Sequence, residues 1–279
     1  MKKNISFESE GLKLVGDFYF HDRNAPTLIL LHGMCYYSFE YEGLASMLLE
    51  KGFNCLVFDF RCHGGSEGKR GDWRLNGLVA DVISALDFLE NEVDGPIGVF
   101  GNSLGGVVAV YAAAQDSRIK ALACCNTATK PSRALYTPLR RWLLVFMKSI
   151  SKVIPFTVNI SYFIPRSLVL SDEEIIERVE NDPKVFESRS FTAETYSEMI
   201  RWDASREVKK VHAPILVIHG KHDKLQPVSQ SELLYESASE PKKLTLIEAG
   251  HVPTLEQTGE LYHVLSDWFE PKLSAAGAL

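Results

Sequence analysis

A serine between two glycines is the residue whose surroundings most clearly indicate chemistry. Ser103 lies in the run IGVFGNSLGG at 97–106, which reads as a strand, then the pattern G-x-S-x-G, then a helix. Gly101 and Gly105 let strand and helix approach closely, and the turn presents the serine at a helix N-terminus, which favours a developing oxyanion. We therefore expect Ser103 to be a nucleophile. An ordinary glycine-rich turn is the alternative.

Serine needs a base to take its proton, and the best candidate is a histidine late in the chain. His251 directly follows the apolar segment 244–247 and precedes the last predicted helix. A loop at the carboxyl end of that strand would bring it to the same crevice as Ser103. His219 is expected to end a strand and His263 to lie within a helix, so structural or solvated roles are expected for both.

The third member should orient the imidazole and stabilise its charged form. Asp223 follows the apolar segment 215–219 and precedes a predicted helix, again at the carboxyl end of a strand. A helix cap or turn former is the alternative for an aspartate in this position. An oxyanion hole needs two donors, and we expect the backbone N–H groups of Leu104 and Met34, where Gly33 allows the chain to turn.

Apolar runs alternate with helical periodicity and predict an α/β fold, in which helices cover both faces of a mostly parallel twisted sheet. A hairpin of 5–9 and 12–20 would form the N-terminal edge. Further strands are expected at 27–31, 55–60, 97–100, 119–125, 215–219 and 244–247. Helices are expected at 41–50, around 78–89, and at 104–115, 228–238 and 258–269.

The alternation breaks between residues 126 and 206, where about 80 residues are too many for a plain loop. We expect a helical cap there, inserted into a core of residues 1–125 and 207–279. Its helices would include an apolar stripe at 139–153 and a capped helix at 173–180. The aromatic residues expected to line a substrate pocket are Trp142, Phe146, Phe156 and Phe163.

The charge of this segment is uneven. No acidic residue occurs between Asp116 and Asp172, whereas nine basic residues do, and the stretch 172–198 is strongly acidic. The two halves could simply pair with each other. The alternative is a lid with a basic rim that receives a fatty-acyl or aromatic ester and contacts an anionic head group or membrane surface transiently.

Composition excludes several classes of protein. A net charge of −6 and a pI near 5.8 argue against nucleic-acid binding. No secretory signal or membrane-spanning run is found, and a cytoplasmic location is expected. The five cysteines fit neither a disulfide framework nor a zinc site, so reduced thiols are expected. Cys35 or Cys62 as nucleophile would need an activating neighbour, and His63 is adjacent to Cys62.

Three stretches make the chain similar to the α/β-hydrolase superfamily: HGM at 32–34, FDFRCHGGSEG at 58–68 and GNSLGG at 101–106. The sequence most resembles the group of monoacylglycerol lipases, lysophospholipase-like enzymes and serine-aminopeptidase-like hydrolases. The resemblance implies a Ser–Asp–His triad in that chain order, a cap over an acyl pocket, and neither metal nor organic cofactor. It also implies structural roles for Asp59, Arg61, His63 and Ser66, with Cys62 in place of the usual glycine.

Together these features predict a serine hydrolase of small-molecule carboxylic esters, of carboxylesterase or monoacylglycerol-lipase type. Thioester or carbon–carbon bond hydrolysis is the alternative within the fold. An aminopeptidase would need acidic cap residues for a substrate ammonium, and Glu173, Glu174 and Glu177 look like a solvated face. Dehalogenases and epoxide hydrolases carry aspartate at the elbow and are excluded. A non-catalytic binding protein is least expected, and the sequence does not predict the oligomeric state.

Overall fold

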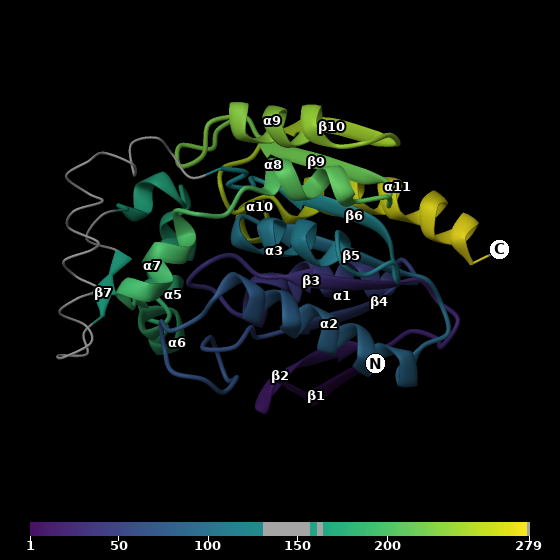
Figure 1. Cartoon of the computed structure of the whole chain (residues 1–279), viewed down its shortest axis with the longest axis horizontal. Helices are drawn as coiled ribbons and strands as arrows, with labels where there is room; N and C mark the ends of the chain where they lie inside the picture. The colour runs from purple at the N-terminus through teal and green to yellow at the C-terminus, as the bar shows by residue number, and fades with distance from the viewer. Residues whose placement is uncertain (131–156, 161–163, 278–279) are drawn as a thin grey trace.

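A computed structural model describes residues 1–130, 157–160 and 164–277 of the chain. Within them, eight strands form one sheet with helices on both faces, in the order β1-β2-β4-β3-β5-β6-β9-β10 (Figure 1). The predicted α/β fold is confirmed. The strands are β1 (Lys2–Ser9), β2 (Leu12–Tyr19), β3 (Thr27–Leu31), β4 (Asn54–Phe58), β5 (Ile97–Asn102), β6 (Ile119–Cys125), β9 (Ile215–Gly220) and β10 (Lys242–Ile247).

The sheet is parallel except at its N-terminal edge, where β2 runs antiparallel to both β1 and β4. Strand β3 shows why the central strands are continuously apolar. Successive side chains of a strand point to opposite faces. Leu28 and Leu30 join the hydrophobic cluster of one face, Ile29 and Leu31 that of the other, and all four are fully buried. A strand covered on both sides has no position for a polar side chain.

The two faces of the sheet are covered by different helices. Leu44 and Phe269 belong to one cluster, and Leu86, Val107 and Leu234 to the other. Helices α1 (Glu42–Glu50) and α11 (Thr258–Ala276) therefore cover one face, and α2 (Leu75–Glu92), α3 (Leu104–Ala113), α8 (Ala204–Glu207) and α9 (Ser229–Ser237) the other. No helix of the described residues is long and apolar enough to cross a membrane.

The last helix is longer than predicted. The predicted end was Phe269, two residues before Pro271, which lacks the N–H for a helical hydrogen bond. The helix continues to Ala276 with Pro271 inside it. Leu265, Phe269 and Leu273 lie at i, i+4 spacing and are all fully buried in one cluster. Burial of Leu273 therefore offsets the lost hydrogen bond.

Of the chain between β6 and β9, β7 (Val158–Asn159), α5 (Glu173–Glu180), α6 (Pro183–Glu187) and α7 (Ala193–Met199) lie together at one end of the sheet (Figure 1). The other described elements of this segment, besides α8, are β8 (Ser190–Phe191) and two 3₁₀ helices, Arg166–Leu168 and Val208–Lys210. Helix α5 has the predicted cap, because the Asp172 carboxylate accepts the N–H groups of Glu174 and Ile175 at 2.9 and 3.1 Å. The predicted stripe at 139–153 lies outside the described residues.

Candidate active site

Ser103 is held in a sharp turn between β5 and α3. Its φ is +53° and its ψ −112°, a conformation that costs on the order of 1–3 kcal/mol. A Cβ at Gly105 would lie 1.9 Å from the carbonyl oxygen of Leu31, and one at Gly101 would lie 2.2 Å from the Gly105 backbone. The Ser103 N–H donates to the Cys125 carbonyl of β6 at 2.8 Å. The two glycines of the pattern are thus needed for close backbone contacts.

His251 and Asp223 meet Ser103 from two other strand ends. Asp223 lies in the turn after β9, and His251 lies in the loop after β10. The His251 Nε2 atom is 3.1 Å from the Ser103 Oγ, and its Nδ1 is 2.8 Å from the Asp223 Oδ2. The structure therefore brings together the three side chains that the sequence singles out, although 148 residues separate Ser103 from His251.

The Asp223 carboxylate is fixed by its own turn. Its Oδ1 accepts the N–H groups of Leu225 and Gln226 at 2.8 and 2.9 Å, and the side chain is fully buried. Its Oδ2 faces the imidazole. Because an ionised carboxylate only accepts hydrogen bonds, it places the proton of a neutral His251 on Nδ1. Nε2 is then left as the acceptor for the Ser103 hydroxyl.

Asn126 ties the histidine loop to the sheet, and our sequence reasoning missed it. It directly follows β6, is fully buried and has a φ of +47°. Its Nδ2 donates to the carbonyls of Gly250 and His251 at 2.9 and 3.0 Å, and its Oδ1 accepts the Gly220 N–H at 2.9 Å. The sequence does contain a signal for Asn126, because it is a polar residue placed directly after a buried strand.

The two backbone N–H groups predicted for an oxyanion hole lie near Ser103. Leu104 is the first residue of α3, so its N–H has no partner within the helix. Met34 lines the same cavity as Ser103. A Cβ on the neighbouring Gly33 would lie 3.8 Å from the Asn102 amide. Within the described residues, neither N–H has a hydrogen-bond acceptor.

Glu40 supports the loop that carries Met34 and was also missed. Its Oε2 accepts the Gly33 N–H at 2.7 Å, and its Oε1 accepts the Thr254 hydroxyl at 2.9 Å. The carboxyl is fully buried, and this burial raises its pKa to about 7. Glu40 therefore links the loop after β3 to α10 (Pro253–Glu256), the short helix that follows His251.

His32 holds the same loop from the other side. Its Nε2 accepts the Phe60 N–H at 3.0 Å, so its Nδ1 carries the proton and donates to the Gly33 carbonyl at 2.9 Å. Burial lowers the pKa of His32 to about 4, so the ring is neutral near pH 7. It connects the end of β3 to the chain beyond β4.

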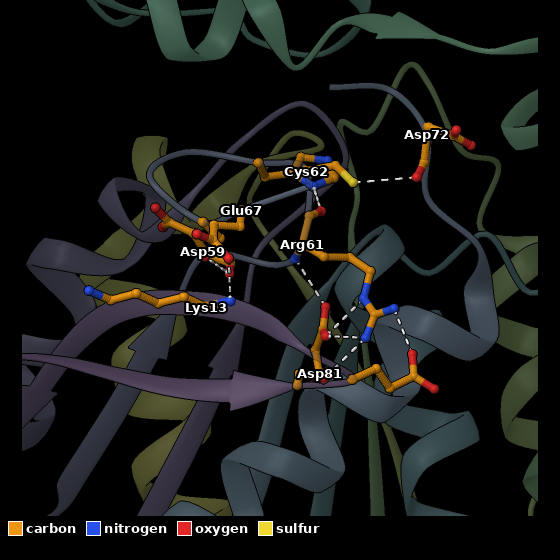
Figure 2. Close-up of polar contacts among 11 residues, drawn as sticks. Lys13, Asp59, Arg61, Cys62, Glu67, Asp72 and Asp81 are labelled. Atoms are coloured by element: carbon orange, nitrogen blue, oxygen red, sulfur yellow. Dashed lines mark hydrogen bonds and ion pairs between the residues drawn. The ribbon is translucent and has the colours of Figure 1, made fainter. Parts of the chain in front are cut away.

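The loop after β4 is cross-linked by charged side chains (Figure 2). Arg61 donates from Nη2 to the Asp81 Oδ1 at 2.7 Å and from Nη1 to the Glu10 Oε2 at 2.7 Å. Asp59 accepts the Gly65 N–H at 2.7 Å. Arg61 thereby anchors the start of the loop to α2 and to the turn between β1 and β2, and the contact of Asp59 with Gly65 closes the loop on itself.

Cys62 occupies a position whose backbone conformation favours glycine. Its φ is +65°, in the left-handed region that glycine adopts without strain. The thiol points to the Asp72 carbonyl at 3.4 Å (Figure 2), and a Cβ at Gly68 would lie 2.7 Å from its sulfur. Burial raises the pKa of Cys62 to about 11 and that of Cys35 to about 12. Neither thiol forms the thiolate a nucleophile requires.

A cavity opens beside Ser103 and His251, on the side of the segment between β6 and β9. Two arginines, Arg166 and Arg189, also line it. The rest of its described wall is mostly aliphatic and includes Ile160, Val169, Leu170, Val179, Val185 and Val252. Four predicted pocket residues lie outside the described part of the chain: Trp142, Phe146, Phe156 and Phe163. Among the described residues, no group of three or more His, Cys, Asp or Glu side chains could hold a metal ion.

The sheet order and its helices define the class of α/β hydrolases. A solved structure of this class, the monoacylglycerol lipase of Paleococcus ferrophilus, superposes with a TM-score of 0.73 at 21% identity. The match covers 96% of this chain and 98% of that one. The fold of the two proteins is therefore shared over nearly their whole lengths.

Residues 22–257 match the family described as "Serine aminopeptidase, S33", and the chain belongs to this family. Human monoglyceride lipase is 26% identical over 277 residues, which cover 93% of this chain and 88% of that protein. The 3-oxoadipate enol-lactonase 2 of Acinetobacter baylyi is 26% identical over 212 residues, 75% of this chain and 76% of that one. The protein is thus a hydrolase of the α/β-hydrolase superfamily, related to the monoglyceride lipases.

Proposed function

We propose that this hydrolase cleaves carboxylic esters with Ser103 as nucleophile, through an acyl-enzyme. The observation that carries the proposal is the hydrogen-bonded chain from Asp223 through His251 to Ser103, at 2.8 and 3.1 Å, beside an apolar cavity. Serine becomes nucleophilic when a neighbouring base takes its proton and a third group orients that base. Here His251 is placed to act as the base for Ser103, and Asp223 orients His251.

In the acylation step, the Ser103 Oγ attacks the ester carbonyl carbon, and its proton passes to the His251 Nε2. The negative charge on the carbonyl oxygen is met by the N–H groups of Met34 and Leu104. When the tetrahedral intermediate collapses, the bond to the alcohol oxygen breaks. The alcohol leaves with the proton from Nε2, and the acyl group remains on Ser103.

The second step reverses these roles. Water gives a proton to the His251 Nε2 and attacks the acyl carbon, and the same two N–H groups stabilise the intermediate. The bond to the Ser103 Oγ then breaks, the oxygen regains the proton and the carboxylic acid is released. The Asp223 carboxylate stays ionised and stabilises the imidazolium in both steps. The balance is one ester and one water to one acid and one alcohol.

The cavity favours an ester with an apolar acyl part. Its aliphatic wall buries methylene groups, each contributing about 0.8 kcal/mol when removed from water. Human monoglyceride lipase, a relative over most of the chain, is by its name an enzyme of acylglycerol esters. We propose that residues 126–206 form a cap over this cavity, inserted into the core of residues 1–125 and 207–279.

Hydrolysis of p-nitrophenyl acetate, butyrate and octanoate tests this function. We expect kcat/KM to rise from acetate to octanoate, because each added methylene enters the aliphatic wall. The variant Ser103→Ala should lose at least a thousandfold in kcat while keeping its thermal melting temperature. A preference for acetate would contradict the apolar acyl site, and unchanged hydrolysis in Ser103→Ala would contradict the mechanism.

A further inference from the structure

Arg189 is a buried cation without a carboxylate partner among the described residues. It lies between α6 and β8 and is only 5% exposed. Its Nη2 donates to the Val179 carbonyl at 3.3 Å, and its Nη1 has no hydrogen-bond partner in the described part of the chain. The segments 131–156, 161–163 and 278–279 contain no aspartate or glutamate. These three segments therefore offer no carboxylate side chain to this guanidinium.

Arg189 lines the same cavity as Ser103 and His251. The second arginine in the wall, Arg166, forms an ion pair with Glu180 and is thereby neutralised. Of the described residues that line the cavity, Arg189 is the one arginine without a carboxylate partner. The positive charge of the wall is thus concentrated at a single residue.

The surroundings of Arg189 do not compensate its charge. The titratable groups that face it are Cys35 and Tyr36, and burial raises the pKa of the Cys35 thiol to about 12, so the thiol is neutral. Burial also lowers the pKa of Arg189 itself. An unpaired buried charge destabilises a fold, and an apolar side chain of similar volume would pack here without that cost. A negatively charged ligand would supply the missing partner.

We propose that Arg189 is an anion subsite and that the substrate is an ester that carries a carboxylate away from the scissile bond. The planar guanidinium matches a carboxylate with two parallel hydrogen bonds, of which Nη1 supplies at least one. The aliphatic wall would hold the methylene groups between the two ends of the substrate. This inference rests on the proposed ester hydrolysis and adds the chemistry of the substrate's far end.

Matched pairs of esters test the subsite. Monoethyl adipate and ethyl hexanoate have the same acyl length, and only the first carries a carboxylate. The butyrate ester of 4-hydroxybutyrate and butyl butyrate form a second pair, with the charge on the alcohol side. We expect a kcat/KM ratio of at least tenfold in favour of the charged member of one pair. A ratio at or below one in both pairs overturns the proposal.

Substitutions of Arg189 test whether this residue causes the preference for the charged ester. Arg189→Met should bring the ratio close to one by slowing monoethyl adipate far more than ethyl hexanoate, and Arg189→Lys should retain part of the preference. Arg166→Met is the matched control, and its ratio should stay within threefold of wild type. If Arg189→Met lowers the melting temperature and slows both esters in equal proportion, Arg189 is a structural residue and the proposal fails.

Ligand binding to the inactive variant Ser103→Ala tests the anion subsite independently of the catalytic mechanism. Calorimetry with adipate should show binding that is lost in the double variant Ser103→Ala, Arg189→Met, whereas hexanamide should not bind. Inorganic phosphate is the second probe, and tighter binding of phosphate than of adipate contradicts a carboxylate site. If no ester is hydrolysed but adipate binds through Arg189, the proposed function fails and the anion subsite stands.

Discussion

At the scale of single residues, the proton on His251 is placed by its neighbours. Asp223 has one oxygen committed to two backbone N–H groups and the other to the imidazole, so the carboxylate cannot turn away. This arrangement keeps Nε2 free to accept the Ser103 proton. Orientation and tautomer are therefore set before any substrate binds.

Asp223→Asn tests this arrangement. The amide oxygen can still accept the N–H groups of Leu225 and Gln226, but its NH₂ group would donate to the His251 Nδ1. The ring proton then moves to Nε2, which can no longer accept from Ser103. We expect kcat for ester hydrolysis to fall roughly 10³–10⁴-fold with an unchanged melting temperature. A loss of less than tenfold would mean that Asp223 does not control the tautomer.

Glu40 predicts a pH dependence of stability. Burial raises the pKa of its carboxyl from 4.5 to about 7. Between these values the folded protein keeps a proton that the unfolded chain releases, so the stabilising contribution is complete below pH 4.5 and lost as pH rises through 7. Glu40→Gln does not titrate. The free energy of unfolding of wild type, relative to this variant, should fall by roughly 2–3 kcal/mol from pH 5 to pH 8.

Urea denaturation of both proteins at pH 5, 6, 7 and 8 measures this difference, and the other titrating groups are common to the two. Parallel pH curves would show that Glu40 ionises normally. A wild type that gains stability over Glu40→Gln with rising pH would mean that the hydrogen bonds from Gly33 and Thr254 outweigh its burial.

At the scale of elements, close packing of α3 on the end of β3 decides which residues are tolerated around Ser103. Gly105 is the second residue of α3, and Gly43 is the second residue of α1. A Cβ at Gly105 would lie 1.9 Å from the backbone oxygen of Leu31, whereas one at Gly43 would meet only the Thr258 methyl at 3.8 Å. The two glycines form a matched pair.

Gly105→Ala should therefore destabilise the protein by more than about 3 kcal/mol or prevent folding, because backbone must move. Gly43→Ala should be neutral or stabilise by about 0.5–1 kcal/mol, since alanine favours the helix. Urea denaturation of purified variants gives both values. Equal effects of the two substitutions would contradict the close contact between α3 and β3.

Element by element, the sequence predicts most of the sheet, since its parallel strands are apolar on both faces. It fails where a distant contact overrides a local signal. The predicted last helix ends at Phe269, but the helix continues past Pro271 because Leu273 finds a buried site against residues far away in the chain. Cys62 takes a left-handed conformation that nothing in its own residue type indicates.

At the scale of the whole molecule, the site is built from loops that follow five neighbouring strands of the sheet. Met34 follows β3, Ser103 follows β5, Asn126 follows β6, Asp223 follows β9 and His251 follows β10. The carboxyl ends of parallel strands lie at one edge, so residues far apart in the chain meet there. This rule is why Ser103, Asp223 and His251 could be predicted together.

The supporting residues could not be predicted, because their roles depend on tertiary contacts. Glu40 is bonded to Thr254, 214 positions away, and its type and local sequence suit a solvent-exposed glutamate equally well. Arg189 is one of many arginines, and only its burial in the cavity wall distinguishes it. Sequence spacing therefore predicts which of the candidate residues Ser103, Asp223 and His251 meet, but not the buried residues around them that hold their loops or line the cavity.

Labelling with a fluorophosphonate, followed by intact mass measurement and peptide mapping, tests directly whether Ser103 is an activated nucleophile. The reagent reacts with a serine that a base has activated and an oxyanion hole faces. If Ser103, His251 and Asp223 act as a triad, we expect one adduct per chain on Ser103. Labelling should be abolished in Ser103→Ala and strongly slowed in Asp223→Asn. A folded protein that takes up no label, or takes it up at a residue other than Ser103, would contradict the account.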